Sequence, residues 1–169
     1  MTRIFKVTNL NLMPKLQSLL KRGFTLVELL VVIGILAVLL AITLIAINPA
    51  RQFSQSNNTK RSSDVNAILN AVHQFAADNR GVLPAGIPDT TAGAAVIGSG
   101  VGEVNICADL VTDYMAALPV DPLTDNGTPV TDCVAAHTTN YEIVRSTTNN
   151  RITVTAPAAE LGSVISVTR

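Results

Sequence analysis

Aromatic residues are scarce in this chain: tryptophan is absent, and only four phenylalanines and two tyrosines occur in 169 residues. A large, aromatic-lined ligand pocket is therefore not expected. The sequence also contains no G-x-S-x-G, H-E-x-x-H or C-x-x-C pattern, and no zinc-ligand spacing joins its two histidines to its two cysteines. We predict no catalytic residue, no metal ligand and no cofactor, and we expect that the protein is not an enzyme.

Two short stretches resemble ligand-binding loops without completing the pattern. In AAVIGSGVGE, Gly98 and Gly100 match the first two glycines of the dinucleotide-binding fingerprint, but Glu103 takes the place of the third and no βαβ unit surrounds it. This stretch is predicted to be a flexible loop. Asp121 and Asp125 lie four residues apart, whereas a calcium loop of the EF-hand type alternates its acids. A turn capped by aspartate is therefore favoured over a calcium site.

Acidic residues are absent from positions 1–23, which hold five basic residues, although the whole chain has 12 residues of each sign. Positions 24–169 therefore carry seven basic and 12 acidic residues. By the positive-inside rule, a basic head before an acidic body indicates a cytoplasmic N-terminus and an exported remainder. The seven basic residues of that remainder are scattered, so no nucleic-acid partner is assigned.

Only two cysteines are present, Cys107 and Cys133, and both lie in the part that is expected to be exported. In an oxidising compartment such a pair favours one disulfide. Two buried free thiols are the alternative, because the sequence does not supply the geometry that a disulfide requires.

A long apolar run from Phe24 to Ile47 is the most prominent feature that is present, and two cations and a glycine precede it. As a helix, its 24 residues would extend about 36 Å, which exceeds the ~30 Å hydrocarbon thickness of a bilayer. We therefore predict a membrane-spanning helix. One acid, Glu28, lies in the run, and a charge at the centre of such a helix costs roughly 2.5–3.5 kcal/mol. Glu28 is either an interfacial carboxylate that reaches headgroup water or a functional group with a partner.

Pro49 follows the apolar run and is predicted to kink or break the helix, because proline disfavours helix for the residue before it and lacks a backbone donor. Helical periodicity then resumes and predicts an amphipathic helix over residues 50–79 that ends near Gly81. Arg61 is placed off its apolar stripe, with other polar residues. The residues of the predicted stripe are Val65, Ile68, Leu69, Val72, Phe75 and Ala76.

The pattern of residues 81–169 predicts a loop, a short helix and a small sheet. Residues 81–105 are rich in glycine, alanine, proline and threonine and are predicted to form a loop, and residues 109–118 have short helical character. Residues 141–146 and 151–156 predict a hairpin, and residues 162–168 form either a third strand or a loose tail. The predicted fold class is α+β: a long N-terminal helix, membrane-spanning in its first half and amphipathic in its second, packed on a small C-terminal antiparallel sheet.

The stretch GFTLVELLVVIGILAVLL resembles the prepilin N-terminal motif of type IV pilins and type II secretion pseudopilins, with a close likeness over residues 22–47. LPVDP, YEIVRS and RITVTAPAAE are similar in style to the C-terminal part of those proteins. The resemblance implies a pilin fold in three parts: a prepilin leader peptide at 1–23, a transmembrane and filament-core helix at 24–47, and an extracytoplasmic globular domain at 48–169. A start at Met13 would give a shorter leader.

The same resemblance implies a role for each part of the motif. Prepilin peptidase would cut between Gly23 and Phe24, the new amino terminus would be methylated, and Glu28 would pair with the Phe24 amino group of a neighbouring copy during assembly. The implied partners are further copies of the chain, the peptidase, the membrane, an inner-membrane assembly platform and an ATPase motor. The chain would be a single-pass membrane protein before assembly and part of an extracellular, periplasmic or cell-surface filament afterwards.

Three functions are open on the sequence alone. The first is a structural subunit of a type IV pilus or pilus-like filament, and the second is a pseudopilin of a type II secretion or DNA-uptake system. The third, from another class, is an extracytoplasmic binding module that uses the helix only as a tether. A tether has no need of the arrangement of Gly23, Phe24 and Glu28.

Cleavage after Gly23 predicts a mature chain that begins with a methylated Phe24. Mass spectrometry of the N-terminal peptide, taken from the protein in its native membranes, measures both features. An intact N-terminus, or a cut at another position, would contradict the prediction and would favour the tether.

Overall fold

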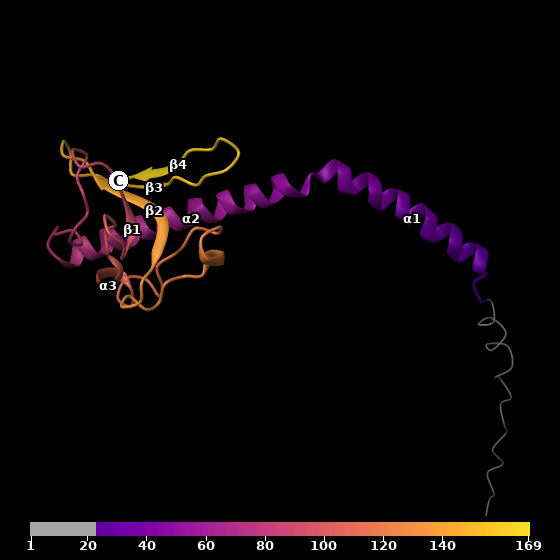
Figure 1. Cartoon of the computed structure of the whole chain (residues 1–169), viewed down its shortest axis with the longest axis horizontal. Coiled ribbons are helices and arrows are strands. Elements are labelled where there is room, and N and C mark those ends of the chain that lie inside the picture. Colours follow the sequence, from indigo (N-terminus) through magenta and orange to yellow (C-terminus); the bar gives the residue numbers. More distant parts are fainter. Residues whose placement is uncertain (1–22) are drawn as a thin grey trace, which may run out of the picture. The chain divides into compact units, whose positions relative to one another are not determined.

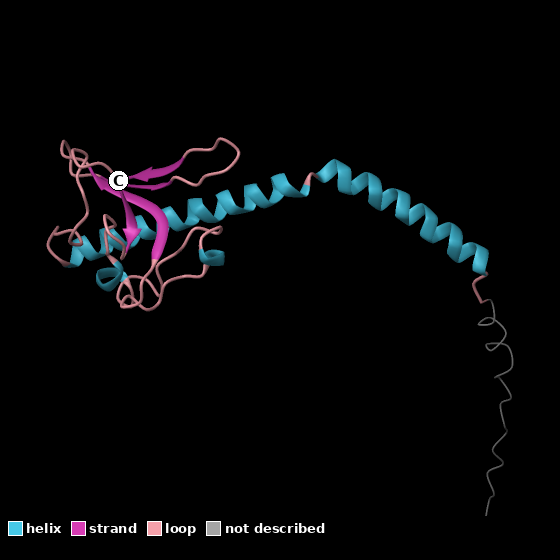
Figure 2. Ribbon diagram, viewed as in Figure 1, coloured by secondary structure: helices cyan, strands magenta, loops and turns pink. Residues whose placement is uncertain are grey.

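The computed structural model describes residues 23–169, so the predicted leader lies outside the described residues except for its last glycine (Figure 1). The chain divides into two units, with the boundary between Ile47 and Asn48. In its described part the first unit contains one long helix. The second contains another helix, a sheet and short connecting elements, which Figure 2 colours by type.

Helix α1 (Leu26–Ile47) is apolar on every side. Its leucine, valine and isoleucine side chains are all between 50 and 84% exposed, and none of its residues is buried. Its 22 residues extend about 33 Å. Within residues 23–169 it is the one helix that is long and apolar enough, by length and composition, to cross a membrane. A helix that is apolar all round requires lipid or other apolar helices about it.

The predicted helix break lies at Asn48. This residue has a left-handed backbone with φ of 46°, and its side-chain oxygen accepts a hydrogen bond from the backbone N–H of Arg51. Pro49 is the first residue of α2 (Pro49–Asp78), where proline is tolerated because the first N–H groups of a helix have no partner within it. The break is confirmed, and α2 matches the predicted helix to within one residue at each end.

The predicted end of α2 is also confirmed. Arg80 and Gly81 both have left-handed backbones, with φ of 57° and 87°. The N–H of Gly81 donates to the carbonyl oxygen of Ala76 at 2.7 Å, as in a Schellman cap. This cap satisfies one of the last carbonyls of the helix and turns the chain away from its axis.

Within residues 23–169, four strands form one antiparallel sheet in the order β1-β2-β3-β4. The predicted hairpin is confirmed as β2 (Thr138–Arg145) and β3 (Ile152–Ala156). The C-terminal segment forms the edge strand β4 (Ile165–Thr168) rather than a loose tail. The remaining strand, β1 (Ala95–Gly98), pairs with β2. Each strand therefore pairs with the next one along the chain.

The prediction that residues 81–105 form only a loop, flexible around the glycines, is wrong. Strand β1 ends at Gly98, where an added Cβ would lie 2.8 Å from the carbonyl oxygen of His137. Glycine here allows two backbone segments to approach closely. Beyond it, the Oε2 atom of Glu103 accepts a hydrogen bond from the N–H of Gly100 at 2.8 Å. Gly98 and Gly100 thus belong to an ordered turn at the end of β1.

The helix predicted over residues 109–118 is shorter and begins earlier, as α3 (Cys107–Leu110). Val111 is extended, with ψ of 141°, and Thr112 has φ of 80°, so the helix does not continue past Leu110. Turns and a 3₁₀ helix, η1 (Asp125–Gly127), then carry the chain to β2.

The core lies between one face of α2 and the sheet, with α3 beside them. Burial alternates along β2 and β3, as expected when one face of a pleated strand is covered. The predicted α+β fold, with a helix laid on a small antiparallel sheet, is confirmed. The fully buried residues of this core in α2, β2 and β3 are Val65, Ile68, Leu69, Val72, Tyr141, Ile143, Ile152 and Val154.

A disulfide joins Cys107 and Cys133 in the structure, with their Cα atoms 5.4 Å apart. Cys107 is buried at the start of α3, and Cys133 packs against the core from the segment before β2. The bond therefore closes a loop between two cysteines that are 26 positions apart and holds the Cys133 segment against the core.

Replacing both cysteines by serine is expected to lower the free energy of unfolding by ~3 kcal/mol, because the cross-link restricts the unfolded chain. Urea unfolding of the full chain in lipid nanodiscs, followed by tyrosine fluorescence, measures the difference. A reductant should lower the stability of the wild-type protein to that of the variant and should leave the variant unchanged. Alkylation of both thiols in the folded, unreduced protein would contradict the bond.

Candidate processing and assembly site

Gly23 and Phe24 precede α1 in a segment without regular secondary structure. Both residues are exposed, and the Phe24 side chain is 81% exposed. Among the described residues, a Cβ added at Gly23 would meet no atom within 4 Å. Within residues 23–169 no close contact therefore explains a glycine at this position.

Thr25 and Glu28 cap the first turn of α1 reciprocally. The Thr25 hydroxyl oxygen accepts a hydrogen bond from the N–H of Glu28 at 3.2 Å. The Oε2 atom of Glu28 accepts from the N–H and from the hydroxyl of Thr25, both at 2.8 Å. This is a capping box, in which a carboxylate and a hydroxyl satisfy helix N–H groups that would otherwise have no partner. The positive end of the helix dipole favours the carboxylate further.

The capping box changes the interpretation of Glu28. T-x-x-E spacing ahead of an apolar run is the sequence signal for such a cap, and our interpretation of Glu28 as interfacial or intermolecularly paired did not include it. The Glu28 carboxylate accepts both of its hydrogen bonds through Oε2. Within residues 23–169 the Oε1 atom of Glu28 makes no hydrogen bond, so it can accept one from a group outside the chain.

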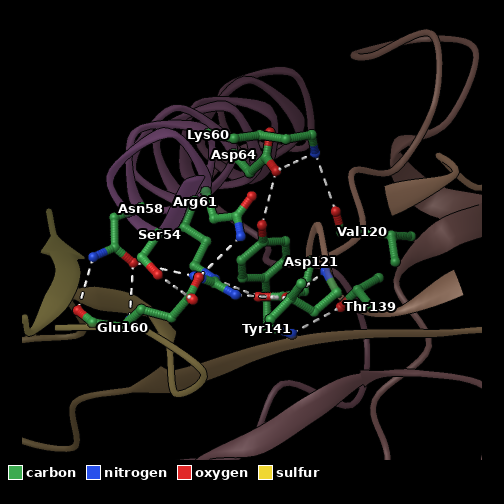
Figure 3. A network of polar contacts seen from close by, with 12 residues as sticks. Ser54, Asn58, Lys60, Arg61, Asp64, Val120, Asp121, Thr139, Tyr141 and Glu160 are labelled. Carbon is green, nitrogen blue, oxygen red and sulfur yellow. Dashed lines mark hydrogen bonds and ion pairs between the residues drawn. The ribbon is translucent and has the colours of Figure 1, made fainter. Parts of the chain in front are cut away.

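A second polar cluster lies in the other unit and centres on Arg61, whose side chain is fully buried (Figure 3). Its Nε and Nη2 atoms donate to the two carboxylate oxygens of Asp121 at 2.6 and 3.1 Å, and its Nη1 atom donates to Glu160 at 2.8 Å. The prediction that Arg61 lies off the buried stripe is wrong. It precedes Val65 by four residues and therefore lies on the same helix face.

Glu160 belongs to the connection between β3 and β4 and contacts the first turns of α2. Besides Arg61, its carboxylate accepts hydrogen bonds from Ser54 at 2.8 Å and from Asn57 at 3.0 Å. The side chain of Asn58 donates to the Glu160 carbonyl and accepts from the Glu160 N–H, at 2.8 and 2.9 Å. These contacts hold the β3–β4 connection against the helix.

The LPVDP stretch supplies the other carboxylate of the cluster. Asp121 is fully buried, and its Oδ1 atom also accepts a hydrogen bond from the N–H of Leu123 at 2.9 Å. Nearby, Asp64 accepts from the Tyr141 hydroxyl and from Lys60, both at 2.8 Å. Within the described part of the chain, no group of three or more His, Cys, Asp or Glu residues could hold a metal ion. Asp121 thus serves an ion pair with Arg61.

These contacts shift the pKa values of three groups in the cluster. The hydrogen bond from Arg61, followed by those from Asn57 and Ser54, lowers the pKa of Glu160 from 4.5 to about 2. Hydrogen bonding to Asp121 raises the pKa of Arg61, so this cation stays charged. Burial, followed by the hydrogen bond to Asp64, raises the pKa of Tyr141.

Because Glu160 has a lower pKa in the folded chain than in the unfolded chain, its contribution to stability is complete above about pH 4.5 and is lost as the pH falls to about 2. The variant Glu160→Gln should therefore show a shallower loss of stability over this range. Glu142→Gln is the matched control, since Glu142 makes no side-chain hydrogen bond or ion pair within residues 23–169. Urea unfolding measured from pH 5 to pH 2 tests this, and equal slopes for Glu160→Gln and wild type would contradict it.

Comparison with known proteins bears on the first of these two sites. The family model of the prokaryotic N-terminal methylation motif matches residues 19–44, which include Gly23, Phe24 and Glu28. No curated protein and no solved structure matches the chain. The confirmed fold agrees with the motif, since a long apolar N-terminal helix is followed by a second helix and a small antiparallel sheet. Residues 19–44 therefore carry the prepilin motif of type IV pilins and pseudopilins.

Proposed function

We propose that this chain is a structural subunit of a type IV pilus or pilus-like filament, cut after Gly23 and polymerised through α1. One observation carries the proposal: the methylation motif covers an exposed apolar helix whose first turn holds a carboxylate, and one oxygen of this carboxylate makes no hydrogen bond within residues 23–169. The motif itself supports a pilin or a pseudopilin, and these two share the processing and the mode of assembly that we propose.

The segment around Gly23 supports processing by prepilin peptidase. The bond between Gly23 and Phe24 lies outside regular structure and ahead of the helix cap, so cleavage there would leave the helix intact. The basic residues of positions 1–23 would keep the leader on the cytoplasmic side of the membrane. No close contact within residues 23–169 requires glycine at the cut, which suits a residue that is selected by the enzyme.

Cleavage would create a positive charge close to Glu28. The new amino group would belong to Phe24, the residue immediately before the Thr25 cap. The Oε1 atom of Glu28 would then pair with the Phe24 ammonium group of a neighbouring copy. Two opposite charges buried together in an apolar filament core offset part of the cost of removing each from water, whereas one alone would not.

The surface of α1 suits two successive environments. Its exposed leucine, valine and isoleucine side chains would face lipid in the membrane-anchored precursor and would face other copies of α1 in the filament. Gly34, Ala37 and Ala41 lie at spacings of three and four residues, and small residues let helices approach closely. An inner-membrane platform and an ATPase motor would move the helix between the two environments.

Glu28→Ala and Glu28→Gln together separate charge pairing from helix capping. Glutamine can still complete a capping box, whereas alanine cannot. If the charge is required, both variants should be cleaved normally and both should fail to form filaments. Electron microscopy of sheared surface material and mass spectrometry of the N-terminus give the two readouts.

Glu142→Gln, a neutralised carboxylate on β2, is the control for loss of charge alone and should assemble like wild type. Filaments of normal length and number from Glu28→Gln would show that the cap suffices and would overturn the pairing. Processed wild-type chains that form only short filaments would indicate the pseudopilin alternative.

A further inference from the structure

The second unit contains a cavity of about 600 Å³ that the proposed function does not use. It lies between the C-terminal part of α2, the segment that follows that helix, and the end of the sheet where β2 leads into β3. Its size is within the range of small-molecule sites. Its polar side chains are His73, Arg145 and Asn150, and its apolar wall includes Val82, Leu83 and Ile87.

Two buried polar atoms of the lining residues have no partner. Within residues 23–169, neither the Nε2 atom of His73 nor the Nε atom of Arg145 makes a hydrogen bond. Most buried polar groups in proteins are paired, because leaving one unpaired costs about 1–3 kcal/mol. Two such atoms on residues of the same cavity would suit a ligand that carries hydrogen-bonding groups.

The guanidinium of Arg145 forms no ion pair within residues 23–169, although after the hydrogen bonds from Thr91 its charge contributes to lowering the pKa of Asp89. The Arg145 backbone is held at the end of β2, since its N–H donates to Pro88 at 2.8 Å and its carbonyl accepts from Thr90 at 2.9 Å. None of the three ion pairs within residues 23–169 includes Arg145. The nearby acid, Asp89, accepts instead from the Thr91 hydroxyl and from backbone N–H groups.

We propose that this cavity binds a small monocarboxylate with an aliphatic body. The guanidinium of Arg145 is a planar fork that matches the two oxygens of a carboxylate, and the His73 ring offers a further polar contact. Val82, Leu83 and Ile87 would contact the aliphatic body. A single arginine balances one negative charge, so a carboxylate suits the cavity better than a doubly charged phosphate.

Binding is tested with the full chain in phosphatidylcholine nanodiscs, with isovalerate as the probe. The NMR signals of the His73 ring should shift saturably with isovalerate, and those of His137 should not. Isovaleramide has nearly the same shape without the charge, and inorganic phosphate has charge without the body. Both should bind at least tenfold more weakly than isovalerate. Empty nanodiscs correct for partitioning of the probe into lipid.

Variants assign the binding to the cavity. Arg145→Gln and His73→Gln should each weaken isovalerate binding, Arg145→Gln by at least tenfold. Arg151→Gln, which removes an exposed arginine from the same hairpin outside the cavity, should bind like wild type. Arg145→Lys keeps the charge but not the fork and should bind with intermediate affinity. Thermal unfolding verifies that each variant is folded before its binding is compared.

Several outcomes would overturn the proposal. Absence of a saturable shift at His73 would refute a carboxylate site. Equal binding of isovaleramide would show an apolar cavity without charge recognition, and equal binding of phosphate would show a general anion site. Wild-type affinity in folded Arg145→Gln or Arg145→Lys would show that the guanidinium does not bind the probe.

Discussion

The buried guanidinium of Arg61 is the constraint on which the second unit depends. Its two carboxylate partners follow it by 60 and 99 positions, so three distant segments must come together before the charge is neutralised. The pair of Arg61 and Asp121 is buried on both sides, and removing one partner of such a pair costs about 3–5 kcal/mol because it leaves an unpaired charge. The ion pairs therefore fix the LPVDP segment and the β3–β4 connection to α2, on the face that also carries the apolar core.

The two units differ in whether their apolar side chains are buried within the chain. The second unit packs α2 on a sheet and completes its own core, with a polar cluster at one side of it. The first leaves every large apolar side chain of α1 exposed. The side-chain hydrogen bonds between Thr25 and Glu28 cap the start of this helix. One unit thus folds by contacts within the chain, and the other is suited to lipid and to further copies. This division agrees with the prepilin motif, which covers α1 as far as residue 44.

Local patterns explain most of what the sequence predicted correctly. Each of these patterns depends on residues that are neighbours in the sequence, so it can be predicted without knowledge of the tertiary contacts. They are the apolar run, the break at Pro49, the amphipathic repeat and the alternation of the hairpin. Strand β1 was missed because it has only four residues, ends in glycine and gains its hydrogen bonds from β2, about forty positions later. The helix predicted over 109–118 was too long because Thr112 has a left-handed backbone and donates its N–H to the Met115 carbonyl, which closes a local turn.

The sequence by itself determined the membrane-length helix, the T-x-x-E cap at its start, the prepilin motif, the amphipathic helix after Pro49 and the C-terminal hairpin. These are features of spacing along one stretch of chain. Tertiary structure alone decided that Arg61 is buried and pairs with Asp121 and Glu160, and that His73 and Arg145 border one cavity. Such pairings depend on which distant residues meet when α2 lies on the sheet. The physical reason is that a charge can be buried only where its partners converge, and convergence is a property of the fold.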